Sequence, residues 1–296
     1  MIIPPYLKKG DTIAIIAPAR FIEPKEIKSF ESWANHCGWK VLTAPNTFGK
    51  FHQFSGTVDE RVNDIKWALD NPEIKAVFCA RGGYGCTQLI GKIEKFDFIT
   101  KPKWWIGFSD ITTLHLTLQN QGLPSIHGPM VMQFNLNHEH HELNQRHLYN
   151  ALSGIANHFG LRNYEMVNAV PFEGQIIGGN LSLLFAHSGI SKQNFIEKIL
   201  FIEDLDEYLY HIDRMICSLK LGGTFSGLKA LIVGSMIDMK DNTIPFGKNV
   251  KEIILEHLEN EGFPIIFDFP AGHDQQNIAL KLGMNCTFDG HTFSQI

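Results

Sequence analysis

The sequence predicts an α/β fold: an N-terminal domain with a mostly parallel sheet flanked by helices, followed by a C-terminal α/β domain. Three observations support this. A chain of 296 residues is long enough for two domains of ordinary size. Short apolar runs alternate with helical patterns, as in buried parallel sheets. The pattern then breaks near the middle of the chain. We therefore expect domains over 1–135 and 171–296, joined by a linker region over 136–170.

In the N-terminal half, apolar runs and helical patterns follow one another in regular order. Strands are expected over 12–17, 39–42, 76–80 and 104–108, and helices over 25–37, 58–69 and 111–121. Gly38 is typical of the residue that ends a helix, here the first one. Asp59 and Glu60 fall in the first turn of the second helix, where the helix dipole favours acidic side chains. Ligands of such sheets bind at the carboxyl ends of the strands.

The C-terminal half repeats the alternation. Helices are expected over 180–187, 207–219 and 250–259, and strands over 199–204, 228–233, 264–267 and 278–280. Before it, the tract from Asn135 to His141 is polar and aperiodic, which favours a solvated linker. Its histidines do not form an H-E-x-x-H zinc motif, because the required second histidine is Glu142. We expect no metal and no cofactor.

Charge and composition argue against two classes of partner. The net charge is −5 and no basic stripe occurs, which argues against nucleic acid. The longest apolar runs fall far short of the roughly 20 residues of a membrane span. The first residues lack the apolar core of a signal peptide, and the five cysteines lack C-x-x-C spacing. A cytoplasmic protein with free thiols is expected.

Ser109 lies where the apolar run Trp104–Phe108 ends and a helical pattern begins. Such a strand-to-helix turn exposes a serine hydroxyl, as in the nucleophile elbow G-x-S-x-G, although Ile111 replaces the second glycine. The alternative is a serine that only caps the helix. A serine nucleophile needs a base and an orienting carboxylate. Glu203, at the end of an apolar run, and His273, in a glycine-containing loop, could supply them.

A glycine-rich segment, Arg81-Gly82-Gly83-Tyr84-Gly85, also follows an expected strand. It fits neither the dinucleotide fingerprint nor the Walker loop. Glycines also let backbone N–H groups approach a developing negative charge, so an oxyanion hole is a third interpretation, and a simple tight turn a fourth. Cys79 and Cys86 flank the segment and raise the question of a thiol nucleophile, but Cys79 ends an apolar run and resembles core.

Together these segments resemble the LD-carboxypeptidase family of serine peptidases, whose other branch is the microcin C immunity peptidases. The resemblance covers nearly the whole chain. Its motifs are Leu7–Pro18, Arg81–Gly85, Gly107–Asp110, His127–Met130, Gly178–Leu184, Glu203–Asp204, Tyr210–Met215 and Gly272–His273. One departure from the family is Leu280-Lys281-Leu282-Gly283, where a Pro-Leu-Gly-like string is common.

The resemblance implies Ser109 as nucleophile, His273 as base and Glu203 as its orienting carboxylate, in a site between the two domains. In elbow-type hydrolases the residue after the nucleophile donates to the oxyanion, here Asp110, and we expect Gly82 or Gly83 to supply a second donor. Arg81 is the candidate for binding the substrate carboxylate, and a structural ion pair with a nearby acidic residue is the alternative.

The implied activity is hydrolysis of an L,D-peptide bond that releases terminal D-alanine from muropeptide tetrapeptides in cell-wall recycling. Two alternatives are a microcin-immunity-type peptidase that cleaves a peptidyl-nucleotide, and a non-catalytic muropeptide-binding protein. The implied partners are a small peptide substrate and a second copy of the chain, because family members commonly form homodimers.

Overall fold

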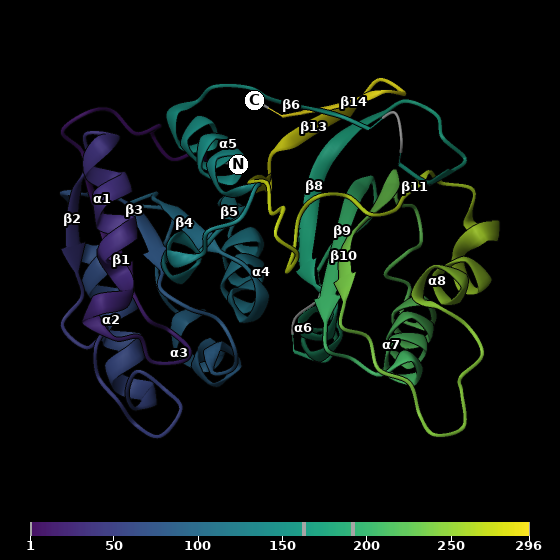
Figure 1. The fold of residues 1–296 in the computed structure, drawn as a ribbon, viewed down its shortest axis with the longest axis horizontal. Helices are drawn as coiled ribbons and strands as arrows, with labels where there is room; N and C mark the ends of the chain where they lie inside the picture. Colours follow the sequence, from purple (N-terminus) through teal and green to yellow (C-terminus); the bar gives the residue numbers. More distant parts are fainter. Residues whose placement is uncertain (1, 162–163, 191–192, 296) are drawn as a thin grey trace. The chain divides into compact units, whose positions relative to one another are not determined.

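The computed structural model describes residues 2–161, 164–190 and 193–295, and the chain divides into two compact units (Figure 1). The first unit comprises Met1–Ala156 and Ile278–Gly283, and the second comprises Asn157–Asn277 and Met284–Ile296. Residues 162–163 of the expected linker lie outside the described residues. Each unit contains one sheet with flanking helices, which confirms the predicted α/β fold class.

The sheet of the first unit has the order β12-β5-β4-β3-β1-β2. Its strands are β1 (Thr12–Ile16), β2 (Lys40–Thr43), β3 (Ile74–Cys79), β4 (Trp104–Gly107), β5 (Ser125–His127) and β12 (Leu280–Leu282). The first five run parallel, and β12 pairs antiparallel with β5. Parallel strands are covered on both faces, which explains why these segments read as continuous apolar runs.

Alternate side chains of β1 enter two separate cores. Ile13 and Ile15 belong to one core, and Ala14 and Ile16 to the other. The first core packs against α1 (Lys28–His36) and α5 (His141–Ser153), and the second against α2 (Val58–Asp70), α3 (Ile90–Ile93) and α4 (Thr112–Asn120). Short 3-10 turns are η1 (Pro24–Ile27), η2 (Cys86–Leu89), η3 (Ser109–Ile111) and η4 (Val131–Asn135).

Helix α5 occupies part of the region expected to be a linker. The residues that it buries are Asn144, His147, Leu148, Ala151 and Leu152. Their spacing of three and four residues is helical, but the first two are polar. Because two of the buried positions are polar, hydrophobic periodicity does not reveal this helix in the sequence. The boundary between the units falls after Ala156.

The sheet of the second unit has the order β6-β14-β13-β8-β9-β10-β11-β7, and β8 to β11 run parallel. Its strands are β6 (Asn157–Gly160), β7 (Met166–Val167), β8 (Phe172–Asn180), β9 (Lys198–Leu205), β10 (Ala230–Ile237), β11 (Ile265–Ile266), β13 (Asn285–Phe288) and β14 (Thr292–Gln295). Its helices are α6 (Leu181–His187), α7 (Leu209–Leu221), α8 (Val250–Leu258) and the short η5 (Glu259–Glu261).

Six strands were not expected from the sequence, namely β5, β6, β7, β8, β13 and β14, and a seventh, β12, belongs to the sheet of the other unit. Strand β8 precedes α6 but was not expected, because glycines interrupt its apolar pattern. One of them, Gly178, has φ +128°, and a Cβ there would overlap the Phe201 carbonyl of the neighbouring strand. The strand expected over 278–280 exists as β12, but it completes the sheet of the first unit.

Candidate active site

Ser109 lies in a sharp turn between β4 and the η3–α4 helical segment of the first unit. Its φ is +62°, in the left-handed region that non-glycine residues rarely adopt. Such a conformation costs about 1–3 kcal/mol and clusters at functional sites. The serine is partly exposed, while Phe108 and Asp110 on either side are buried. This is the geometry of a nucleophile elbow.

The chain bends tightly around Gly107, and this accounts for the isoleucine in the elbow motif. A Cβ on Gly107 would lie 2.8 Å from Cγ1 of Ile111, whose side chain is fully buried against the turn. The first glycine of the motif is therefore required for space. The second is not, because its position provides the side chain that packs against the first.

The structure argues against the capping alternative for Ser109. The N-cap residue of η3 is Phe108, and no side chain caps that helix end. Asp110 is turned inward, and its carboxylate accepts a 2.8 Å hydrogen bond from the Cys86 amide. Burial raises the pKa of Asp110, while that amide and the charges of Arg61 and Arg20 oppose the rise. The Ser109 hydroxyl is thus not used to start the helix.

Three glycines in the segment after β3 each leave space for the side chain of a different neighbouring residue. A Cβ on Gly82 would lie 3.2 Å from Cβ of Ser109, and one on Gly83 would lie 2.5 Å from Cδ of Arg20. A Cβ on Gly85 would lie 2.6 Å from Nη1 of the buried Arg61. The segment is therefore a crowded turn directly beside Ser109, as the predicted site requires.

The backbone of this turn is available to a ligand. Within the described residues, neither the Gly82 nor the Gly83 amide donates a hydrogen bond to another backbone or side-chain group. Arg81, at the start of the turn, is partly buried, and no other described residue forms an ion pair or hydrogen bond with its guanidinium. Amides and a cation beside a serine suit the binding of negative charge.

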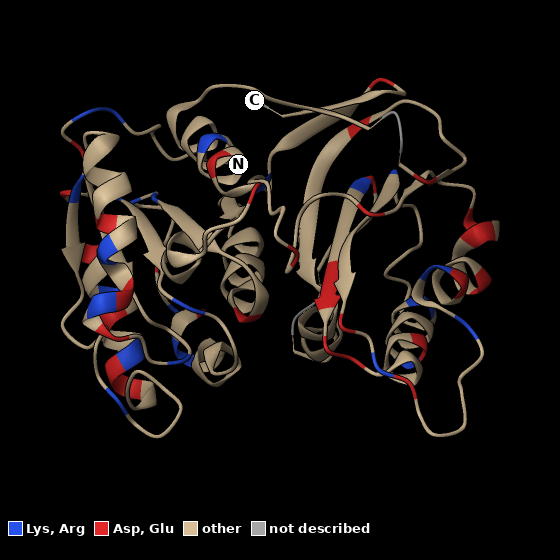
Figure 2. Ribbon diagram, viewed as in Figure 1, with Lys and Arg blue, Asp and Glu red and all other residues tan. Residues whose placement is uncertain are grey.

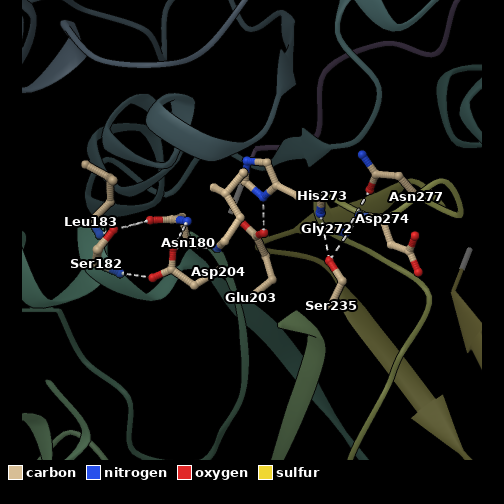
Figure 3. Close-up of polar contacts among 11 residues, drawn as sticks. Asn180, Ser182, Leu183, Glu203, Asp204, Ser235, Gly272, His273, Asp274 and Asn277 are labelled. Carbon is tan, nitrogen blue, oxygen red and sulfur yellow. Dashed lines mark hydrogen bonds and ion pairs between the residues drawn. The ribbon is translucent and has the colours of Figure 1, made fainter. Parts of the chain in front are cut away.

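The other two predicted residues meet in the second unit (Figure 3). His273 Nδ1 lies 2.6 Å from Oε2 of Glu203, which is fully buried near the end of β9. A carboxylate only accepts hydrogen bonds, so it selects the tautomer with the proton on Nδ1. Nε2 is then the basic nitrogen of the neutral ring, as a general base requires.

The loop that carries His273 is held by two residues that the sequence did not single out. Ser235 Oγ, on β10, accepts a 2.7 Å hydrogen bond from the His273 amide, and Asn277 accepts a 3.0 Å bond from the Gly272 amide. Gly272 has φ +129°, and a Cβ there would overlap Ser235 Oγ and lie 3.0 Å from Glu203. The glycine before His273 is thus required for the histidine to approach Glu203.

Asp204 points to the other face of β9 from Glu203, as successive strand residues do. Figure 2 shows the acidic end of this strand, and Figure 3 its contacts. Asp204 accepts hydrogen bonds from Asn180 Nδ2 at 2.8 Å and from the Ser182 amide at 2.9 Å. Burial and the charge of Glu203 raise the pKa of Asp204 to about 7. One carboxyl orients His273, and its neighbour anchors the start of α6.

The pKa of His273 is raised overall. Burial disfavours the imidazolium, but the charge and hydrogen bond of Glu203, with the nearby charge of Asp204, outweigh burial. A protonated His273 cannot accept a proton from a nucleophile. We therefore expect kcat/KM to fall on the acid side with a midpoint above the ordinary value of 6.5.

This pH dependence can be measured by NMR titration of the His273 imidazole alongside the rate profile. Glu203→Gln is expected to lower the His273 midpoint, because the negative charge is lost. Glu207→Gln is a matched control, because Glu207 pairs at 2.7 Å with a different histidine, His211. A wild-type midpoint at or below 6.5 contradicts the assignment.

The surroundings of Cys79 and Cys86 disfavour a thiol nucleophile. Cys79 and Cys86 are both buried, and burial raises the pKa of each thiol, which disfavours the reactive thiolate.

Within residues 2–161, 164–190 and 193–295, no cluster of three or more His, Cys, Asp or Glu side chains is arranged to hold a metal ion. In the same ranges no helix combines the length and apolarity needed to cross a membrane.

A cavity of about 750 Å³ lies in the second unit between β10, Phe267 and α8. Its walls include Met236 and Leu255 and none of the predicted site residues. Lys251 at its edge is ion-paired to Glu165 at 2.8 Å and to Asp268 at 2.6 Å. The chemistry of the candidate site does not involve this cavity.

Comparison with known proteins gives one consistent family. The family model for the LD-carboxypeptidase N-terminal domain matches residues 13–128, and the model for the LD-carboxypeptidase C-terminal domain matches residues 173–288. The "probable murein peptide carboxypeptidase" of Bacillus subtilis is 32% identical over 289 residues, covering 95% of this chain and 89% of that protein.

Solved structures share the fold. The muramoyltetrapeptide carboxypeptidase from Oxalobacter formigenes aligns with a TM-score of 0.82 at 24% identity, covering 96% of this chain and 98% of that one. The MccF-like protein from Bacillus anthracis aligns with a TM-score of 0.85 at 22% identity, covering 100% and 99%. With both family models matched in order along the sequence, the chain belongs to the LD-carboxypeptidase family.

Proposed function

We propose that the protein is a serine carboxypeptidase that hydrolyses the L,D-peptide bond of muropeptide tetrapeptides and releases terminal D-alanine. The observation that carries the proposal is the 2.6 Å contact between His273 Nδ1 and Glu203. That contact provides an oriented base, and the strained turn at Ser109 provides a nucleophile of the matching type. The murein peptide carboxypeptidase named above supports the substrate class.

In the proposed reaction, Ser109 Oγ attacks the scissile carbonyl carbon while His273 Nε2 takes the hydroxyl proton. Glu203 stabilises the imidazolium that forms. Amides of Gly82 or Gly83 and of Asp110 bind the oxyanion. Collapse of the intermediate breaks the C–N bond, and His273 gives its proton to the amine of the leaving D-alanine. Water then hydrolyses the acyl-enzyme by the same steps, with His273 again as base.

The proposed reaction requires Ser109 and His273 to come together, and the length of the chain that joins them permits this. Leu280 follows His273 by seven residues, so an extended chain can separate them by at most about 25 Å. Leu280 pairs with His127 of β5, and His127 pairs with Gly107 of β4, two residues before Ser109. The loop of the base is thus tethered to the sheet of the nucleophile.

The substrate ends in a carboxylate, and we propose that Arg81 contributes to its binding. We therefore expect kcat/KM to be much lower when that carboxylate is amidated. The loss of transition-state binding free energy should be several kcal/mol, because the site's hydrogen-bond donors lose their charged partner. The measurement is mass spectrometry of the free-acid and amidated tetrapeptides after timed incubation. Equal rates on both peptides would show that no carboxylate site exists.

The same assay separates the alternatives. Turnover of a peptidyl-nucleotide in place of the tetrapeptide indicates an immunity-type peptidase, and binding without turnover indicates a non-catalytic protein. The 32% identity to the murein peptide carboxypeptidase, over 95% of this chain, favours the murein substrate.

We also propose that the protein acts in the cytoplasm as a homodimer, without nucleic acid as a partner. Free thiols, including the four buried ones, suit a reducing compartment. The net charge of −5 disfavours phosphate backbones. Light scattering on the purified protein measures the oligomeric state directly.

A further inference from the structure

Arg20 lies beside the candidate site, although nothing in its sequence context singles it out. It follows β1 by four residues, and its backbone forms an isolated antiparallel bridge with Phe54. Strand β1 lies next to β3 in the sheet, and the glycine turn follows β3. The carboxyl ends of parallel strands share one edge, so the two segments emerge together.

The Arg20 side chain lies directly on the glycine turn. A Cβ on Gly83 would be 2.5 Å from Cδ of Arg20 and 2.6 Å from Nε. Any residue with a Cβ at position 83 would therefore displace it. Gly83 also has φ +104°, which strains other residues. Cδ and Nε of Arg20 therefore lie in the space that a side chain at position 83 would occupy.

That position is close to the nucleophile. Gly82, the next residue, is the one whose Cβ would lie 3.2 Å from Cβ of Ser109. From these contacts, Arg20 Nε lies no more than about 13 Å from the Ser109 Cβ. The charge of Arg20 also opposes the rise in the pKa of Asp110, the residue after the nucleophile.

The Arg20 guanidinium is not neutralised by any described residue. Arg20 is exposed, and no described residue forms an ion pair or hydrogen bond with its side chain. Arg61, which contacts Gly85 of the same turn, is different. It is buried and donates to the carbonyls of Pro18 at 2.8 Å and Gly85 at 2.9 Å. Arg61 therefore supports the turn, whereas the charge of Arg20 is open to a ligand.

We propose that Arg20 is a specificity-determining residue that binds the terminal carboxylate of the substrate together with Arg81. The two arginines flank Gly82 and Gly83, and each lacks an acidic partner among the described residues. Two guanidinium groups bind one carboxylate more tightly and more selectively than one, since each can donate two parallel hydrogen bonds. This inference rests on the proposed carboxypeptidase function.

The test is the ratio of kcat/KM for the free-acid tetrapeptide to kcat/KM for its C-terminal amide. In Arg20→Met we expect the free-acid value to fall by roughly 10- to 100-fold with little change on the amide, so the ratio collapses. Arg20→Gln, a second neutral variant, is expected to do the same, and Arg20→Lys to keep part of the ratio. Thermal unfolding checks that each variant is folded.

Lys50→Met is the matched control. Lys50 is a cation of the same unit that lies 4.4 Å from the ring centre of Phe21, next to Arg20, and the ratio should not change. If Arg20→Met leaves the ratio unchanged while Arg81→Met lowers it, Arg81 acts alone and the inference is wrong. If both peptides slow equally, Arg20 has only a structural role. If the parent protein cleaves neither peptide, the proposed function itself fails.

Discussion

Replacement of Ser109 with alanine is expected to lower kcat on the tetrapeptide by about 10⁶-fold. The hydroxyl is the proposed nucleophile, and the partly exposed turn offers no neighbouring serine that could replace it: the residues beside it are Phe108 and Asp110. The measurement is single-turnover release of D-alanine, with tetrapeptide affinity determined separately by calorimetry.

Affinity should persist in Ser109→Ala, because only the reacting atom is removed. Ser29→Ala, on the exposed side of α1, is a matched control and should be fully active. Ser109→Gly should be equally inactive, but its free energy of unfolding should be higher than that of Ser109→Ala, since glycine adopts the φ of +62° without strain. An alanine variant that folds and retains activity within about tenfold of the parent shows that another group is the nucleophile.

Glu203→Gln is expected to lower kcat by about 10⁴-fold, the cost of the equivalent acid-to-amide change in a serine triad. An amide can donate to His273 Nδ1 and so favours the tautomer with the proton on Nε2. That nitrogen could then no longer accept the proton of Ser109. The measurement is again single-turnover kinetics, with thermal unfolding to confirm that this buried substitution leaves the fold intact.

Asp206→Asn provides the comparison, because Asp206 lies three residues along the chain and pairs with Lys240 at 2.6 Å on the surface. It removes the same charge from the same region and should leave the rate unchanged. Activity of Glu203→Gln within tenfold of the parent would falsify the role of Glu203 as the orienting carboxylate.

The parts of the fold that the sequence predicted are those in which local pattern and burial agree. Strands β1, β3 and β4 are apolar runs because both faces of their sheet are covered. The contact between Glu203 and His273 was also expected, and the structure places these residues 2.6 Å apart. Their catalytic roles, and the role of Ser109, remain predictions.

The features that the sequence missed depend on contacts between distant segments. Nothing in the local sequence distinguishes Ser235 from other strand serines, and only its hydrogen bond with the His273 amide reveals its role. Arg20 is one exposed arginine among many surface cations until Gly83 leaves space for its side chain. Strand β8 contains three glycines, and only the approach of Phe201 explains one of them. Hydrophobic periodicity does not report such contacts.

The last strand of the first sheet has a consequence for biosynthesis. Because β12 (Leu280–Leu282) pairs with β5, the sheet that carries Ser109 lacks its sixth strand until residues 157–277 of the second unit have also been synthesised. Until then β5 is an open edge, which can pair with other chains. A truncated chain ending at Ala156 would keep that edge permanently. The nascent protein is therefore most prone to aggregate while the second unit is being synthesised.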